Sequence, residues 1–198
     1  MQNEARKLIA GLAKAAAPSS DHDLNPDVVL HANRELRPAA VLIALWERPD
    51  GVRVILTKRS SHLMHHPGQI AFPGGKLDPG DVNAEAAALR ESHEEIGLPA
   101  MLVTVMGQLA THETVTGFSV TPILGYISED FTPSAEAGEV DEVFTVPLHH
   151  LLSVENYSVE QRLWRGQVRK FYVVPYGPYY IWGATARILY SLARGAQP

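Results

Sequence analysis

The 198-residue sequence contains no cysteine, which excludes a disulfide framework, a thiol nucleophile and a zinc–thiolate site and weakly indicates the cytoplasm. Long hydrophobic runs are missing as well. The longest, PAAVLIALW at residues 38–46, is far shorter than the roughly 20 residues that a membrane-spanning helix needs. Residues 1–17 carry charges throughout and lack the apolar stretch of a signal peptide. We therefore expect a cytoplasmic protein with no membrane partner.

Basic residues are too few for a nucleic-acid surface. Lys and Arg total 17 against 22 Asp and Glu, a net charge of −5, which argues against a partner with a phosphate backbone or an anionic lipid surface. A small anionic substrate would need local cations or a metal. With 45% apolar residues the chain can bury a sizeable core. We expect a single domain over 1–198, with an N-terminal helix and lead-in at 1–36 and a core at 37–190.

The apolar patterns predict a mixture of strands and helices. Residues 39–47 and 52–59 flank Arg-Pro-Asp-Gly and predict a hairpin. Helices are expected at 4–17, 83–95 and 184–194, with Asn83 and Gly97 capping the second. Further strands are expected at 70–72, 102–110, 119–127, 142–146, 157–163 and 168–175, an exposed loop at 128–142, and a turn at 175–180. This order predicts α+β or an α/β/α sandwich with a mixed sheet.

Three glutamates stand within five positions of the second helix, namely Glu91, Glu94 and Glu95. Such neighbours repel one another, so the cluster needs a reason. On a helical wheel they cover an arc of roughly 100°, and we expect the opposite side, with Leu89 and Ile96, to pack. Mg²⁺ and Mn²⁺ take oxygen ligands of this kind. For the three glutamates alone, a solvated helix face is the commoner interpretation.

The loop before this helix, FPGGKLDPG at residues 72–80, changes that balance. Gly74 and Gly75 permit a backbone approach to a ligand that side chains would block. Arg90 stands one turn before Glu94 and can hold its carboxylate in position. A glycine loop followed by a carboxylate helix favours a metal–pyrophosphate site.

This stretch resembles the Nudix box, G-x5-E-x7-R-E-U-x-E-E-x-G-U. The matching residues are Gly75, Arg90, Glu91, Glu94, Glu95, Gly97 and Leu98. The spacing from Gly75 to Arg90 is one residue longer than in the general box, Asp81 replaces the early glutamate, and Ser92 stands at a usually aliphatic position.

The longer spacing resembles the coenzyme A pyrophosphatase branch, which also has an upstream pattern, L-L-T-x-R-S-x3-R-x3-G-x-V-x-F-P-G-G. Here residues 55–75 read ILTKRSSHLMHHPGQIAFPGG, with Met64 in place of the second arginine. The likeness extends over residues 37–190 through RPAAVLIAL, EVDEVFTVPL and IWGATARIL.

The resemblance implies a Nudix fold with a catalytic loop–helix–loop. It also implies metal-dependent hydrolysis of coenzyme A or its derivatives to adenosine 3′,5′-bisphosphate and 4′-phosphopantetheine or its acyl form. Glu91 and Glu95 would be the principal ligands of Mg²⁺ or Mn²⁺, and the Gly74 carbonyl a further one. Glu94 would be a ligand or the base that takes a proton from water, and Arg90 would orient the glutamates.

A glutamate from a distant loop often completes such sites. The candidates are Glu113, Glu139 and Glu142, and we favour Glu139 in a catalytic role. We expect the substrate to be contacted by Lys58, Arg59, Ser60, Gln69 and Gly75, with the Arg59 guanidinium suited to a phosphate. The family also implies a homodimer.

Several alternatives stay open. The same helix could serve ADP-ribose, a dinucleotide or a nucleoside triphosphate, and the fold could be a nucleotide-binding module without turnover. His62, His65 and His66 indicate a loop lining the substrate cleft more strongly than a second metal site. Trp182 could stack an adenine, although a buried aromatic residue is the simpler interpretation.

Overall fold

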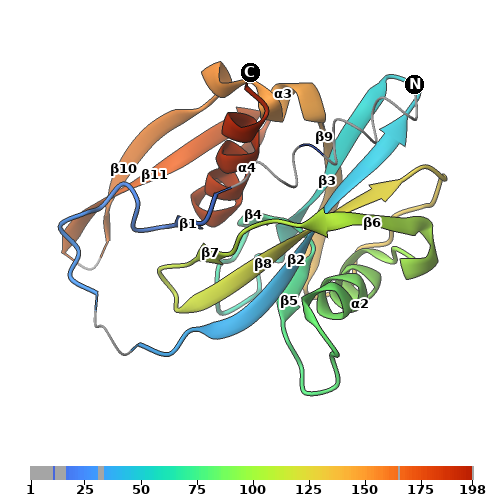
Figure 1. Cartoon of the computed structure of the whole chain (residues 1–198), viewed down its shortest axis with the longest axis horizontal. Helices are drawn as coiled ribbons and strands as arrows, with labels where there is room; N and C mark the ends of the chain where they lie inside the picture. The colour runs from blue at the N-terminus through green and yellow to red at the C-terminus, as the bar shows by residue number, and fades with distance from the viewer. Residues whose placement is uncertain (1–10, 12–16, 31–33, 165, 198) are drawn as a thin grey trace.

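The computed structural model describes residues 11, 17–30, 34–164 and 166–197. The helix expected at 4–17 therefore lies outside the described residues, apart from positions 11 and 17. The described part contains a large mixed sheet, a smaller antiparallel sheet and helices on both sides of the large sheet (Figure 1).

The large sheet has nine strands in the described chain. They are β1 (Ser19–Ser20), β2 (Arg37–Arg48), β3 (Gly51–Arg59), β4 (Ile70–Ala71), β5 (Gly74–Lys76), β6 (Val103–Gln108), β7 (His112–Glu113), β8 (Phe118–Ile127) and β9 (Val140–Pro147). The small sheet consists of β10 (Ser158–Trp164), β11 (Gln167–Tyr176) and β12 (Tyr179–Trp182). The helices are α2 (Ala84–Ile96), α3 (Leu148–Leu152) and α4 (Gly183–Gly195), with 3₁₀ turns at Ala100–Leu102 and Val154–Asn156.

The predicted hairpin is confirmed. β2 and β3 pair antiparallel up to the contact of Arg48 with Gly51, so Pro49 and Asp50 form a two-residue turn. On its other side β2 runs parallel to β8, from Arg37 opposite Phe118 onward, which makes the sheet mixed. β9 pairs with β3 and β5 pairs with β2, so the glycine turn and the strand that follows Glu139 both attach to this hairpin.

The large sheet has helices on both faces. Successive residues of β2 alternate between the two hydrophobic clusters, because strand side chains point to opposite sides. One face packs against α2 and buries Ala40, Leu42, Ala44, Trp46, Ile55, Ala87, Ala88, Ile96, Leu98, Ile123 and Ile127. The other packs against α3 and α4 through a cluster that includes Ile43, Leu45, Leu56, Phe144, Leu151, Ile188, Leu189 and Leu192. The α/β/α sandwich is thus confirmed, and none of the described helices is long and apolar enough to cross a bilayer.

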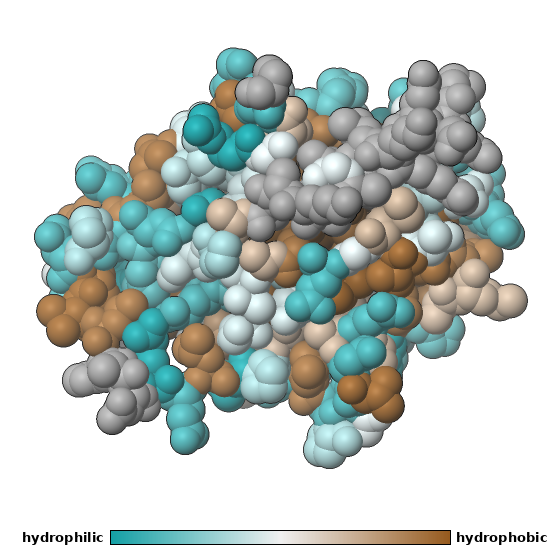
Figure 2. All heavy atoms as spheres, viewed as in Figure 1, coloured by the Kyte–Doolittle hydropathy of each residue, from teal (hydrophilic) through white to brown (hydrophobic). Residues whose placement is uncertain are grey.

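The region after β9 differs from the sequence prediction. Residues 179–182 form β12, antiparallel to β11, where we expected only a turn over 175–180. Gly177 and Pro178 make a tight turn, and the aromatic and β-branched residues that follow favour a strand. The five-residue helix α3 was also not predicted; it buries Leu148 and Leu151. Three apolar side chains of the β10–β11 hairpin are exposed: Val159, Leu163 and Val168. Figure 2 shows a brown patch on the side of the molecule where this hairpin lies in Figure 1.

Helix α2 begins and ends at the predicted caps. The Asn83 side chain accepts a hydrogen bond from the Ala86 N–H, which satisfies one free donor of the first turn. Gly97 adopts φ 68°, and its N–H donates to the His93 carbonyl at 2.9 Å. These two caps fix the length of the helix and so the positions of its glutamates.

Gly97→Ala should lower the free energy of unfolding by about 1 kcal/mol, because a Cβ is disfavoured in the left-handed region. Space is not the limiting factor, since the nearest atom to that Cβ is 3.4 Å away. Urea unfolding provides the measurement. Gly80→Ala is the control, because Gly80 lies in open space and has no positive φ, and it should leave stability nearly unchanged. Equal effects of both substitutions would contradict the role of the cap.

Candidate active site

The glycine turn of β5 lies directly against the carboxylates of α2. Gly74 has φ 150°, and its N–H donates to the Glu95 carboxylate (Oε2) at 3.1 Å. A Cβ at Gly74 would collide with the Ala40 carbonyl of β2. A Cβ at Gly75 would lie 2.5 Å from the Glu91 carboxylate. Both glycines are therefore needed for the helix and the sheet to approach this closely.

Glu95 is buried, with 4% of its surface exposed. Burial raises the pKa of its carboxyl to about 7, opposed by the hydrogen bond from Gly74 and by the charge of Arg59, and reinforced by Glu91 and Glu139. The helical wheel did not predict this burial. The wheel placed the three glutamates together correctly, but the sheet covers the Glu95 side of the arc.

Arg90 is the centre of an ion-pair network on the outer side of α2. One guanidinium nitrogen donates to Glu91 at 3.0 Å and to Glu94 at 2.8 Å, which agrees with the expected pairing one turn apart. The other side of the guanidinium donates to Asp81 at 3.1 and 2.9 Å. The hydrogen bond to Asp81 is the main cause that raises the Arg90 pKa, and it lowers the Asp81 pKa. Asp81, a departure from the box pattern, thus fixes Arg90.

The two remaining glutamates of α2 differ in exposure. The Glu91 side chain is 18% exposed and that of Glu94 is 56% exposed. Burial raises the Glu91 pKa, while Arg90 lowers it, and the charges of Glu94 and Glu139 raise it further. The carboxylates of Glu91 and Glu95 therefore share a desolvated region, in which a positive charge would stabilise their ionised forms.

The start of β9 carries Glu139 toward this region. The Ser60 N–H donates to the Glu139 carbonyl at 2.8 Å, and the Ser61 N–H donates to the Asp141 carboxylate at 3.0 Å. The Glu139 charge raises the pKa of both Glu91 and Glu95. The loop expected at 128–142 thus ends at β9 beside the carboxylates.

The other two distant glutamates have different partners. Glu113 accepts hydrogen bonds from Arg34 at the β7 edge of the sheet. Glu142 accepts a hydrogen bond from the Tyr179 hydroxyl, on the α4 side of the sheet. Of the three candidates, Glu139 is the one whose charge acts on the carboxylates of α2.

Of the candidate substrate residues, Arg59 lies beside the carboxylates, and Lys58, Ser60 and Gln69 lie elsewhere. The Arg59 guanidinium lies 3.8 Å from the Glu95 carboxylate. Strand alternation points Lys58 to the opposite face, the face of Leu56, so the structure separates these two neighbours. Ser60 is buried at the end of β3, and Gln69 lies near Gly183, where an added Cβ would be 3.5 Å from the Gln69 amide nitrogen.

The loop between Ser60 and Gln69 is exposed. His62, His65 and His66 are all exposed, and Met64 has 91% of its surface exposed. Met64 therefore does not pack into the described part of the fold. Its position leaves the side chain free for contact with a ligand.

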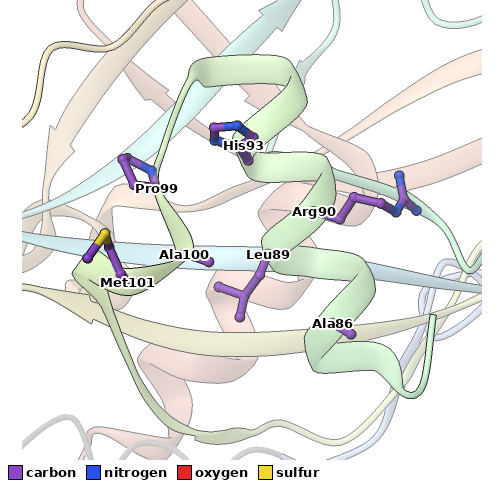
Figure 3. A pocket seen from close by; sticks show the side chains of 7 residues that line it. All are labelled: Ala86, Leu89, Arg90, His93, Pro99, Ala100 and Met101. Atoms are coloured by element: carbon purple, nitrogen blue, oxygen red, sulfur yellow. The ribbon is translucent and has the colours of Figure 1, made fainter. Parts of the chain in front are cut away.

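A shallow, mainly apolar pocket lies on the outer flank of α2. Figure 3 shows the side chains that line it, from the helix and from the segment after it: Ala86, Leu89, Arg90, His93, Pro99, Ala100 and Met101. It shares only Arg90 with the ion-pair network. The carboxylates of Glu91 and Glu95 face the sheet instead.

The donor set suits a hard divalent cation in its chemistry. Glu91 and Glu95 are desolvated carboxylates, and the glycine turn leaves room beside them for a ligand. Within residues 17–30, 34–164 and 166–197, however, no three acidic or histidine side chains already surround one point. The carboxylates now pair with Arg90 and Arg59. They would have to move toward one another to bind a cation together.

Known proteins resemble this chain over most of its length. A family model described as the NUDIX domain matches residues 36–166. The uncharacterized Nudix hydrolase NudL of Enterobacter sp. (strain 638) is 41% identical over 183 residues, covering 87% of this chain and 95% of the relative. NudL of Escherichia coli (strain K12) is 43% identical over 164 residues, covering 81% and 85%.

Solved structures show a weaker likeness. The Nudix hydrolase RenU of M. smegmatis is 26% identical with a TM-score of 0.46, and the match covers 59% of this chain and 73% of RenU. The family match includes the glycine turn, α2 and the loop before them. The chain therefore belongs to the Nudix hydrolase family.

Proposed function

We propose that this Nudix hydrolase cleaves the pyrophosphate bond of coenzyme A or its derivatives, giving adenosine 3′,5′-bisphosphate and 4′-phosphopantetheine or its acyl form. One observation carries the proposal. The segment 55–75, which resembles the coenzyme A pattern, packs directly on the carboxylate helix. Arg59 from its start lies 3.8 Å from Glu95, and Gly74 from its end donates to the same carboxylate. The contact between the segment that resembles the coenzyme A pattern and the carboxylate helix is what supports the proposal.

Mg²⁺ or Mn²⁺, when bound, would neutralise phosphate oxygens and lower the pKa of a coordinated water. Glu91 and Glu95 are the residues that would hold it, with Glu94 and the Gly74 carbonyl as further oxygen donors. Arg90, which Asp81 holds in place, donates hydrogen bonds to the Glu91 and Glu94 carboxylates. The role of these hydrogen bonds is to limit the freedom of the ligands before the substrate arrives.

The reaction itself requires a base. Water attacks one phosphorus atom, a P–O bond forms, and the P–O bond to the bridging oxygen breaks, so that the other phosphate leaves as an anion. The proton of the water passes to a carboxylate, for which we propose Glu94 or Glu139. Arg59 is placed to exchange its contact with Glu95 for a phosphate oxygen of the substrate.

Two other functions compete with this one. Because α2 handles only the pyrophosphate, ADP-ribose, a dinucleotide or a nucleoside triphosphate would meet the same chemistry. A nucleotide-binding module without turnover is less well supported. Such a module has no need to keep a desolvated carboxylate at Glu95 and a glycine pressed against Glu91, both of which reduce stability.

A substrate panel should distinguish these functions. With Mg²⁺ or Mn²⁺, coenzyme A should yield adenosine 3′,5′-bisphosphate, identified by mass, while ADP-ribose and nucleoside triphosphates should be turned over poorly. If the protein prefers ADP-ribose or a nucleoside triphosphate, that compound is the substrate and the assignment to coenzyme A is wrong. If no member of the panel is cleaved, the protein is a binding module.

Glu95→Gln should abolish most turnover and yet stabilise the metal-free protein. The folded pKa of Glu95 is raised from 4.5 to about 7, so its contribution to stability is present below pH 4.5 and is lost as the pH rises through 7. At 1.36 kcal/mol per pKa unit, removing the charge should raise the free energy of unfolding at pH 8 by about 3 kcal/mol. The gain should vanish near pH 4.

The measurement is urea unfolding with EDTA at both pH values. Glu85→Gln, an exposed residue of the same helix, is the control and should change stability by less than about 0.5 kcal/mol. Mn²⁺ should stabilise the parent protein but not Glu95→Gln. A variant that is less stable at pH 8, or that keeps its full rate at limiting Mg²⁺, would refute the role of Glu95.

A further inference from the structure

The small sheet presents arginines and aromatic rings on the face that points away from α4. Alternation along β10–β12 places two arginines and three aromatic rings there, together with Glu160 and Tyr180, and we name five of them the arginine–aromatic face: Arg162, Trp164, Arg169, Phe171 and Trp182. The opposite face contributes Val174 and Ile181 to the cluster under α4. The arginine–aromatic face is therefore not part of that core, and Arg162 is exposed.

The side chains of this face contact one another closely. The Phe171 and Trp182 rings lie 5.1 Å apart at 59°. The Arg162 guanidinium lies 5.7 Å from the centre of the Trp182 ring, and the Arg169 guanidinium 4.8 Å from that of Trp164. Flat rings with cations above them form a surface to which a base can add by stacking.

The two arginines bring like charges close together on this face, which also carries the Glu160 carboxylate. Arg162 and Arg169 are directly opposite each other across the strands, an arrangement that destabilises a sheet. Across the described ranges neither forms an ion pair with a carboxylate. The nearby Glu160 accepts a hydrogen bond from Tyr180 instead, at 2.7 Å, and the buried Arg169 Nε has no hydrogen-bond partner within the described chain. An anion would relieve this repulsion.

The face begins where the loop from the candidate active site ends. Trp182 precedes Gly183, which lies next to the Gln69 side chain. The Gln69 carbonyl accepts a hydrogen bond from the Arg59 N–H at 3.0 Å, and the Arg59 guanidinium lies 3.8 Å from Glu95. The Thr185 hydroxyl, which donates to the Ile70 carbonyl at 3.1 Å, fixes α4 to the same segment.

We propose that the arginine–aromatic face binds the adenosine 3′-phosphate end of the substrate, an assignment that rests on the proposed coenzyme A activity. The adenine ring stacks at Trp182 and Phe171, and Arg162 binds the 3′-phosphate. Arg59 is engaged at Glu95, beside the site of the pyrophosphate, so the 3′-phosphate needs a cation elsewhere. Arg162 and Arg169, for which the described residues show no ion pair, supply it.

Kinetics on two substrates test the assignment. Arg162→Gln should raise the KM for coenzyme A about tenfold, the effect of losing one charge-assisted bond, and leave kcat unchanged. Its KM for dephospho-coenzyme A, which lacks the 3′-phosphate, should not change. Trp182→Leu should raise both KM values about tenfold, and Trp182→Phe should restore most of the loss. Arg48→Gln is the matched control, because Arg48 also covers a tryptophan, Trp46 at 4.3 Å, but at the far end of the β2–β3 hairpin; it should change neither KM.

A binding assay without turnover separates this inference from the proposed function. Adenosine 3′,5′-bisphosphate should quench the tryptophan fluorescence of the parent protein. The concentration that gives half of the quenching should be about tenfold higher for Arg162→Gln. Adenosine 5′-monophosphate should bind the parent protein and the variant equally. If coenzyme A is not cleaved but this binding pattern holds, the proposed function is wrong, and the assignment of the arginine–aromatic face as a binding site for adenosine 3′-phosphate is supported. If coenzyme A is cleaved with an unchanged KM in Arg162→Gln, the inference is overturned. A change of mass by light scattering in that variant, with KM unchanged, would assign the face to a second copy of the chain and also overturn it.

Discussion

The close contact between the glycine turn and α2 is the constraint on which the site depends. Gly74 is pressed against the backbone of β2 on one side and donates to Glu95 on the other. Gly75 leaves just enough room for the Glu91 carboxylate. A side chain at either position would push the helix away from the sheet and remove the desolvation that raises the pKa of Glu91 and Glu95.

That desolvation accounts for the charges around the helix. Buried carboxylates are tolerated only with partners, and here Arg90 and Arg59 serve from two sides. Asp81 competes with the glutamates for Arg90, so the guanidinium is held in place without fully neutralising Glu91 or Glu94. The network therefore restricts the carboxylates while leaving a net negative region, which would suit a divalent cation.

Sequence patterns predicted the local structure of this region well. The Pro-Asp-Gly turn fixed the β2–β3 hairpin, and Asn83 and Gly97 fixed both ends of α2. The Arg90–Glu94 pair followed from helical spacing. Such features depend on neighbours within four residues, where backbone geometry leaves few choices.

Features that depend on tertiary contacts could not be predicted in this way. A helical wheel groups Glu91, Glu94 and Glu95 but does not say which side of that group the sheet covers, so the burial of Glu95 was missed. Alternation on β3 separates Lys58 from Arg59, but only the placement of α2 decides which one faces the carboxylates. The arginine–aromatic face depends on the register of β10 and β11, and the strand after Gly177 was itself missed.

These contacts indicate that different segments of the fold would serve the reaction and the choice of substrate. In the proposed reaction the glycine turn and α2 would meet only the pyrophosphate, a group common to many nucleotides, so they could not by themselves distinguish one substrate from another. Discrimination has to come from segments that extend beyond the pyrophosphate. The loop from Ser60 to Gln69 and the β12–α4 junction are connected to the site through Arg59 and through the Gln69–Gly183 approach. A change in either segment can alter which nucleotide binds without disturbing Glu91 and Glu95, because neither segment supplies the backbone that the carboxylates contact.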